Sequence, residues 1–335
     1  MDTRTLRQNA PATAARRPFE AHGVTHVGLK REKNADQFLV GEIQRVLRVR
    51  STSLETERTR NVGKGPAGYL LVVADGVGST LAGDQASAIA VETMITHITA
   101  AMQLTKRGVS LEQDLLNEFT KAIVQAHARL LEEGQTNPAL KGWATTLTMA
   151  YTLGNRAYIG HVGDSRCYLV SKGVARAVTK DQTFAQMLID QGVLTRTAAE
   201  GSRYHNVLAS VVGGSDDPEV LSYMLALESG DTIVLCTDGL FKHVTDEEIG
   251  QLAGNGTVET AAQALVDAAL RGGGSDNVTV IVGRFEIQEA TEPEIGKATV
   301  VTPKEEKKSV DASLGDADML DSDETMIVQK YKPSS

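Results

Sequence analysis

Apolar side chains recur every three or four residues in two long stretches that follow each other directly in the chain. The first covers about residues 83–104 and the second about residues 110–133, and this spacing predicts two helices. Ser110 and Gln113 form a capping box at the start of the second helix, and Gly134 is expected to end it. Because the link between the helices is short, we expect an antiparallel pair.

Short segments rich in β-branched residues and bounded by turn residues predict strands. These segments lie at residues 70–73, 157–159, 167–170, 232–236 and 278–282. A third helical pattern covers about residues 257–271. Runs of strands separated by runs of helices favour an α+β fold with antiparallel sheets over alternating βαβ units.

Composition divides the chain into three parts. Residues 1–20 are rich in Arg, Ala and Thr without apolar periodicity, which predicts a disordered basic arm. A mitochondrial transit peptide is the alternative for this arm. Residues 21–286 form the single predicted domain. Residues 287–335 contain eleven carboxylates and six lysines, which leaves a net charge of −5 and predicts a disordered acidic tail.

The overall balance of residues excludes several classes of protein. Hydrophobic residues make up 41% and charged residues 23%, as in a globular protein with a core. The net charge of −9 argues against nucleic-acid binding through a broad basic surface. No apolar run reaches the ~18 residues of a membrane span. Cys167 and Cys236 are too few for a disulfide scaffold, so we expect a reducing, cytoplasmic location.

Five aspartates lie at the ends of predicted strands, most of them beside a glycine. They are Asp36, Asp75, Asp164, Asp238 and Asp276. Taken singly, an Asp-Gly pair after a strand is more typical of a hairpin turn than of a functional site. If the five converge, however, their charges repel and the cluster requires a cation. Carboxylate oxygens without a nearby His or Cys suit Mg²⁺ or Mn²⁺ rather than zinc.

The contexts of these aspartates occur in a fixed order along the chain. They are Arg31-Glu-Lys-Asn34-Ala-Asp36, Val73-Ala-Asp75-Gly-Val-Gly78, Val162-Gly-Asp164-Ser-Arg166, Cys236-Thr-Asp238-Gly239-Leu and Gly274-Ser-Asp276-Asn277. The series resembles the metal-dependent protein phosphatase family (PPM, or protein phosphatase 2C) in its bacterial form. Each motif alone is weak, but five in order over about residues 22–284 make the resemblance specific.

The resemblance implies a fold and an activity. The fold would be a four-layer α-β-β-α sandwich, with two antiparallel sheets flanked by antiparallel helix pairs. The activity would be that of a protein serine/threonine phosphatase, which hydrolyses phosphoserine and phosphothreonine by direct attack of a water activated between two Mn²⁺ or Mg²⁺ ions. Its partners would be phosphorylated proteins and a cognate Ser/Thr kinase that it opposes. We do not expect nucleic acid or membrane partners. We expect the protein to be a monomer.

The resemblance also assigns metal ligands to positions of this chain. Asp75 would bridge both ions, and the carbonyl of Gly76 would bind one of them. Asp238 and Asp276 would hold the first ion. Asp36 would support the second ion, directly or through its waters.

Further positions follow from the same resemblance. Asp164 matches the position associated with a third, weaker metal site. Arg31 would grip the substrate phosphate, because a guanidinium fork fits phosphate oxygens. Arg31, Asp36 and Asp75 would then form the catalytic set. Residues 188–194 would form a flap-like helix.

Four positions depart from the family pattern: Ala35, Val77, Ser79 and Thr80. Ala35, Ser79 and Thr80 keep a second hypothesis open, that of a catalytically silent module that binds phosphoproteins in the same cleft. His161 beside the Asp164 motif is more typical of a structural histidine than of a metal ligand.

The acidic tail carries a separate hypothesis. Thr302 and Thr325 lie in acidic surroundings and are candidates for phosphorylation by the partner kinase. A phosphothreonine-binding domain would then recognise the tail. The alternative is a plain solvated tail, which is common among acidic termini. For Trp143, the simplest expectation is a core anchor.

Overall fold

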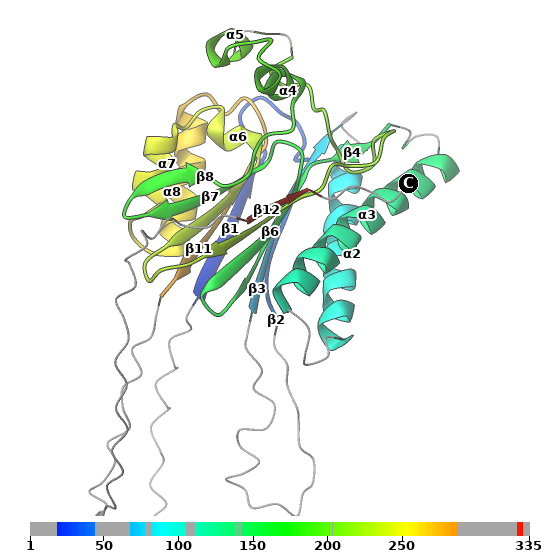
Figure 1. The fold of residues 1–335 in the computed structure, drawn as a ribbon. Helices are drawn as coiled ribbons and strands as arrows, with labels where there is room; N and C mark the ends of the chain where they lie inside the picture. The colour runs from blue at the N-terminus through cyan, green and yellow to red at the C-terminus, as the bar shows by residue number, and fades with distance from the viewer. Residues whose placement is uncertain are drawn as a thin grey trace, which may run out of the picture.

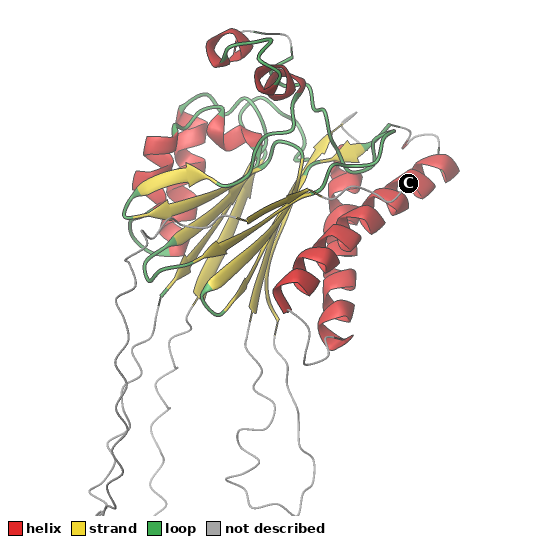
Figure 2. Ribbon diagram, in the orientation of Figure 1, coloured by secondary structure: helices red, strands yellow, loops and turns green. Residues whose placement is uncertain are grey.

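The structure is a computed structural model that describes residues 19–43, 68–77, 82–104, 111–137, 140, 142–200, 202, 204–286 and 327–330. Two antiparallel sheets face each other, and helices cover the outer face of each (Figures 1 and 2). This is the α-β-β-α order expected from the sequence. The calls on Ser79, Thr80, Thr302 and Thr325, on residues 1–18 and on most of the tail lie outside the described residues.

The smaller sheet has five strands. In order of pairing they are β1 (Phe19–His26), β11 (Val278–Phe285), β10 (Thr232–Cys236), β7 (Arg166–Ser171) and β8 (Val174–Ala177). Its outer face is covered by α7 (Asp246–Ala253) and α8 (Val258–Arg271). Both helices begin with a capping box, in which the side chains of Thr245 and Thr257 accept from the helix backbone.

The larger sheet has six strands that pair in sequence and a seventh, short strand that pairs only with the end of one of them. In order of pairing they are β12 (Ile327–Lys330), β9 (Leu221–Ala226), β6 (Arg156–Val162), β5 (Leu147–Leu153), β3 (Gly68–Val77) and β2 (Asp36–Ile43). A two-residue strand, β4 (Ala144–Thr145), pairs with the end of β3. Strand β12 comes from the segment that composition predicts to be solvated, and its backbone pairs antiparallel with the edge strand β9.

The predicted antiparallel helix pair covers the outer face of this larger sheet. It consists of α2 (Gly83–Leu104) and α3 (Leu111–Thr136), which pack against each other and against the sheet (Figure 1). The expectation that α3 ends at Gly134 is wrong, since the helix continues for two residues. A Cβ at Gly134 would lie 3.2 Å from Nε1 of Trp143, so this glycine gives the indole room to pack on the helix.

Strand β3 shows how the core is divided between the layers. Alternate residues point to opposite faces of a strand. Leu70 and Val72 belong to the cluster under α2 and α3, whereas Leu71 and Val73 belong to the cluster between the two sheets. Because both faces are covered, β3 is a continuous apolar run instead of an alternating one. A third cluster joins the smaller sheet to α7 and α8.

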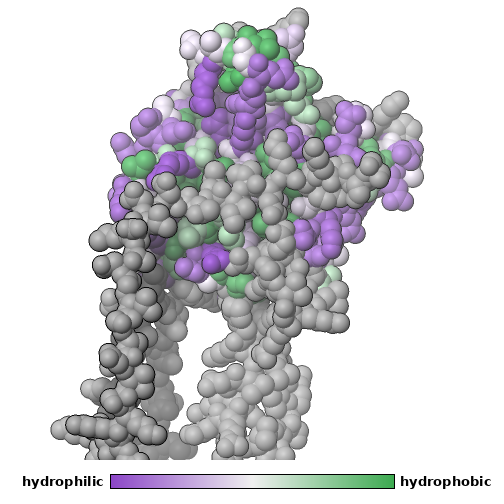
Figure 3. Space-filling view, viewed as in Figure 1, coloured by the Kyte–Doolittle hydropathy of each residue, from purple (hydrophilic) through white to green (hydrophobic). Residues whose placement is uncertain are grey.

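Two short helices stand above one end of the sandwich (Figure 1). They are α4 (Phe184–Asp190) and α5 (Arg196–Glu200). The helix expected at 188–194 is therefore placed four residues too late. Thr183 caps the N-terminus of α4 and accepts from Gln186 N, and Gly192 with φ +69° lies in the turn that follows the helix. Apolar residues show as a green spot in this region (Figure 3), where Phe184, Met187, Val193 and Val207 are exposed.

None of the described helices combines the length and the apolar character needed to cross a lipid bilayer.

Candidate active site

Two of the predicted residues, Asp36 and Asp75, face each other across neighbouring strands. Asp36 is the first residue of β2 and pairs in register with Asp75 near the end of β3. Asp36 is 3% exposed, and its Oδ2 accepts hydrogen bonds from the hydroxyls of Thr237 at 2.8 Å and Thr279 at 2.7 Å. Its Oδ1 is also buried but has no hydrogen-bond partner among the described residues.

Asp238 lies next to this pair at the end of the smaller sheet. It follows Thr237 directly and begins the short helix α6 (Asp238–Phe241). Gly239 packs against the turn that carries Asp276, since a Cβ at Gly239 would lie 1.9 Å from the carbonyl oxygen of Asn277. Oδ1 of Asp238 is a second buried carboxylate oxygen without a partner within the part of the chain that the structure describes.

Asp276 accepts from two cationic side chains. Arg31 reaches it with Nε at 2.8 Å from Oδ1 and Nη2 at 3.0 Å from Oδ2, which is a bidentate pair. Lys242, at the end of α6, brings its Nζ within 3.1 Å of Oδ2 of Asp276 and also forms an ion pair with Oδ2 of Asp238. One ammonium therefore joins two of the predicted metal ligands.

The fifth aspartate, Asp164, follows β6 after a glycine in the left-handed region. Gly163 has φ +108°, and a Cβ there would lie 2.7 Å from the side chain of Thr146. Only glycine fits this turn, and it places Asp164, 8% exposed, at the same end of the sandwich.

These residues line one cleft of about 830 Å³. Its walls include Arg31, Asp75, Gly76, Asp164, Asp238 and Asp276. Asp36 lies buried behind Asp75 and is the only one of the seven predicted site residues outside this lining. Aspartates separated by up to 240 positions in sequence therefore converge at one end of the two sheets.

Burial dominates the electrostatics of the cluster. Loss of solvent and, to a lesser extent, the charges of neighbouring carboxylates together raise the pKa of Asp36 and of Asp164 to about 7. Burial and the charges of Asp36 and Asp238 hold the pKa of Asp75 well above its usual value. Burial also raises the pKa of Asp238, although Lys242 opposes this effect. Four carboxylates are therefore unfavourable as anions without added positive charge.

Asp276 is different because it already has cations beside it. Burial acts to raise its pKa, but the hydrogen bond from Arg31 and the charge of Lys242 outweigh burial and hold the pKa below its usual value. Arg31 and Lys242 have raised pKa values in turn, as expected for cations that neutralise carboxylates. Among the described residues, the cationic side chains that contact the cluster thus form ion pairs with Asp276 and Asp238.

The donor set fits a hard divalent cation. Within the described residues, no three His, Cys, Asp or Glu side chains are already arranged as a metal site. Three buried carboxylate oxygens of the described residues nevertheless lack a hydrogen-bond partner, and two of them, on Asp36 and Asp238, belong to the predicted ligands; the third is on Asp84 at the start of α2. Buried charged oxygens without partners are costly, and a bound cation would satisfy them. All the candidate ligands are oxygens, which suits Mg²⁺ or Mn²⁺.

Several residues that position the site were not assigned a role from the sequence. Asn277 is the clearest: its Oδ1 accepts from the backbone of Ala35 at 2.9 Å, and its Nδ2 donates to the carbonyls of Val27 at 2.9 Å and Lys33 at 2.8 Å. It fixes the loop that carries Arg31 to the turn that carries Asp276. Its place directly after Asp276 could have indicated this role.

Lys242 was also missed. It lies four residues after Asp238, and side chains at this spacing face the same side of a helix. That spacing was visible in the sequence, but the contact to Asp276 depends on the packing of two distant turns and was not.

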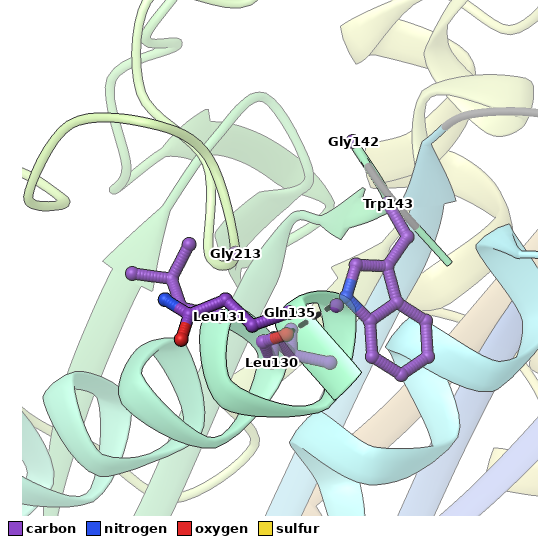
Figure 4. Close-up of a pocket in the computed structure, with 7 residues that line it drawn as sticks. Leu130, Leu131, Gln135, Gly142, Trp143 and Gly213 are labelled. Carbon is purple, nitrogen blue, oxygen red and sulfur yellow. Dashed lines mark hydrogen bonds between the residues drawn. The ribbon is translucent and has the colours of Figure 1, made fainter. Parts of the chain in front are cut away.

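A second cavity, of about 460 Å³, lies beside the cleft and shares Gly142 and Gly213 with it. Figure 4 shows the indole of Trp143 directed at the last turns of α3, where Nε1 donates to the carbonyl of Leu130 at 2.9 Å. Trp143 is 2% exposed, which confirms it as a core anchor. Because Ala144 and Thr145 continue from it into β4 beside Gly76, this anchor also holds one wall of the site.

One other expectation is confirmed. His161 is fully buried, and its ring nitrogens lie 2.8 Å from the hydroxyl of Thr148 and 3.1 Å from the carbonyl of Lys180, so it is a structural residue. Cys167 and Cys236 are buried free thiols on neighbouring strands.

With this geometry, the comparisons identify the class of protein. Residues 59–271 match the family model described as Protein phosphatase 2C, and the chain belongs to this family. The serine/threonine protein phosphatase PstP of Mycobacterium tuberculosis is 35% identical over 213 residues, which are 64% of this chain and 40% of that relative. The chain thus spans less than half the length of PstP.

Two further similarities refine this result. The serine/threonine phosphatase stp of Listeria monocytogenes is 31% identical over 216 residues, which are 64% of this chain and 83% of that protein. The crystal structure of the catalytic domain of PstP in complex with two manganese ions aligns with a TM-score of 0.61 at 29% identity. The alignment covers 80% of this chain and 99% of that one. The predicted family and sandwich fold are confirmed.

Proposed function

We propose that this protein is a metal-dependent protein serine/threonine phosphatase that hydrolyses phosphoserine and phosphothreonine. The observation that carries this proposal is the pair of unpartnered buried oxygens on Asp36 and Asp238, in a cluster of five carboxylates at one cleft. The names of the relatives in Mycobacterium and Listeria support the same reaction.

The residues of the chain would hold the metal ions as the family resemblance assigns them. Asp75 pairs in register with Asp36 on the neighbouring strand, and the charges of Asp238 and Asp276 also act on it, which supports the bridging position. Gly76 packs tightly against Gly83, since a Cβ at Gly76 would lie 2.1 Å from the carbonyl oxygen of Gly83, so only glycine fits at this position. Asp238 and Asp276 would hold the first ion, and Asp36 would support the second.

Bound there, two divalent ions would activate a water for in-line attack on phosphorus and neutralise the phosphate oxygens. Arg31 would orient the substrate. Its side chain is 53% exposed at the cleft, and its contacts with Asp276 use two of its five N–H donors. The others can donate to phosphate oxygens while Asp276 keeps the guanidinium in place. No nucleophilic side chain is required for direct attack by water.

The proposal predicts an activity that requires metal and the carboxylate cluster. The full chain with Mn²⁺ should hydrolyse p-nitrophenyl phosphate and a phosphothreonine peptide, and EDTA should abolish both reactions. Asp238→Asn should lower kcat/KM by about a hundredfold or more, because the metal supplies several kcal/mol to the transition state. The matched control is Glu247→Gln. It removes an exposed carboxylate on α7, which covers the outer face of the smaller sheet, and should leave turnover unchanged.

Two results would contradict the proposal. Turnover that persists after EDTA treatment would exclude the metal mechanism. Binding of the phosphopeptide without turnover, at saturating Mn²⁺, would instead support the silent binding module that Ala35 leaves open.

We further propose a metal preference, a third metal site, a location and an assembly state. A manganese preference is supported by the PstP catalytic domain in complex with two manganese ions. Asp164 lines the cleft beside Asp238, which supports a third, weaker metal site there. The two free thiols support a reducing, cytoplasmic location. We also propose a monomer that acts on phosphoproteins and opposes a cognate Ser/Thr kinase.

A further inference from the structure

Lys242 places a fixed positive charge inside the carboxylate cluster. Its Nζ forms ion pairs with Oδ2 of Asp238 and, at 3.1 Å, with Oδ2 of Asp276. The side chain is 25% exposed, and Asp276 is 19% exposed. The ammonium therefore lies among the carboxylates that would hold the first divalent ion.

We infer that Lys242 is an internal counter-cation, which occupies the Asp238–Asp276 pair in the metal-free protein and must be displaced when a divalent ion binds there. This inference rests on the proposed function, since it assumes that these two carboxylates bind metal. Lys242 contacts Oδ2 of Asp238 and leaves Oδ1 free, but an ammonium and a divalent ion at the same two carboxylates repel each other, so each disfavours binding of the other there.

The structure explains why a cation is needed at Asp238 and Asp276, and it contains a space that the displaced side chain of Lys242 can occupy. Among the described residues, five aspartates of the site face only Arg31 and Lys242 as cations in direct contact. Of these two cations, Arg31 contacts Asp276 alone, and Lys242 is the one that forms an ion pair with Asp238. Removing it would leave the metal-free cluster with less compensating charge.

A second polar cavity adjoins the cleft beneath α4 and α5. Its volume is about 500 Å³, and it shares Asp164, Asn206, Asp238 and Lys242 with the cleft. Because Lys242 lines both spaces, its flexible side chain can leave the metal ligands without entering the protein core. Binding of the metal ion would then be coupled to release of Lys242 from the carboxylates.

The exchange predicts opposite effects on metal affinity and on metal-free stability. Lys242→Met keeps the length of the side chain and removes the charge. We expect this variant to bind Mn²⁺ about tenfold more tightly, a change that corresponds to about 1.4 kcal/mol. We also expect its Tm in EDTA to fall below that of the wild type, since the carboxylates lose a partner.

The experiment is a Mn²⁺ titration by calorimetry, with Tm measured in EDTA, on the full chain. Lys33→Met is the matched control because Lys33 lines the same cleft without an ion pair to Asp238 or Asp276. It should match the wild type in both measurements. Lys242→Arg keeps the charge, so it should retain the metal-free Tm and bind Mn²⁺ no more tightly than the wild type.

Each other outcome overturns the inference in a recognisable way. A lower Tm for Lys242→Met with unchanged affinity would make Lys242 a purely structural ion pair. Unchanged Tm and unchanged affinity would remove any role in the cluster, while the proposed function would stand. If the wild type and all variants fail to bind Mn²⁺, the metal site fails, and with it both the proposed function and this inference. Should Lys242→Met not fold, tighter Mn²⁺ binding by Lys242→Arg than by the wild type would overturn the inference.

Discussion

Asp36 and Asp75 lie directly opposite each other on β2 and β3, so a buried carboxylate and a half-buried one share one side of a strand pair. Like charges at such a position destabilise a sheet. The hydroxyls of Thr237 and Thr279 satisfy one oxygen of Asp36 and leave the other without a partner. The fold therefore maintains a charge conflict at this point, which is the arrangement expected where a cation is to be held.

This conflict predicts an unusual pH dependence for the metal-free protein. Asp36 and Asp164 titrate near 7 in the folded state and near 3.8 when unfolded. Between these values the folded state holds protons that the unfolded state has released, so stability falls as pH rises through this window. In EDTA, the free energy of unfolding should be higher at pH 5 than at pH 8 by on the order of 2–4 kcal/mol.

Urea unfolding at several pH values in EDTA measures this effect, and Asp36→Asn should flatten the profile. Asp276 does not oppose the trend, because its pKa is lowered and its contribution is lost only in more acidic solution. Buried His161 opposes it in part, since burial lowers its pKa to about 4 and its contribution to stability rises with pH up to about 6.5. A metal-free protein that is more stable at pH 8 than at pH 5 would contradict the assigned burial of these carboxylates.

Asn277 should act as a positioning residue for Arg31. Asn277→Ala removes three hydrogen bonds that join the loop of residues 27–35 to the turn at Asp276. We expect a loss of roughly 2–4 kcal/mol in unfolding free energy and a higher KM for a phosphopeptide, because the guanidinium is no longer held at the cleft. Steady-state kinetics and urea unfolding measure the two effects. An unchanged KM would show that Arg31 is positioned by Asp276 alone.

Gly239 should control the distance between two metal ligands. Gly239→Ala places a methyl group 1.9 Å from the carbonyl oxygen of Asn277, so the turns that carry Asp238 and Asp276 must separate. We expect a destabilisation of about 1–3 kcal/mol and weaker Mn²⁺ binding. Gly41→Ala in β2 is the control, since the nearest atom to its Cβ would be 3.9 Å away. Equal Mn²⁺ affinities for the two variants would argue against the ligand pair.

Trp143 should stabilise the wall that carries β4. Trp143→Phe loses the hydrogen bond to the carbonyl of Leu130 and leaves part of a filled volume empty. We expect a cost of about 1–3 kcal/mol in unfolding free energy. Because the change is remote from the carboxylates, Mn²⁺ affinity should be affected much less than stability. A large loss of Mn²⁺ affinity at unchanged stability would contradict a purely structural role.

Much of the fold was available from the sequence because its strongest periodic segments are also its most buried ones. The helices at 83–104 and 257–271 and the five predicted strands lie where expected. The helix end at Gly134 was mispredicted because the glycine accommodates Trp143, a tertiary contact. The helix at 188–194 was misplaced because the capping side chain of Thr183 fixes the start of α4.

The candidate site was predictable to a different depth. The aspartates could be found because each ends a strand or begins one, and such positions are rigid. Asp36 and Asp75 were predicted as ligands, but their pairing in register follows only from the sheet. The position of Asn277 after Asp276 and the four-residue spacing of Asp238 and Lys242 were visible in the sequence. The contacts that define their roles join turns that are distant in sequence, so these contacts could not be predicted from periodicity or motif spacing.

The central claim is that the aspartates of the cleft hold divalent ions. Its most direct test is anomalous diffraction from crystals of the full chain grown with Mn²⁺. The account predicts two strong anomalous peaks bridged by Asp75, one against Asp238 and Asp276 and the other on the side of Asp36. Crystals without a peak in this cleft, or with manganese bound only elsewhere, would contradict it.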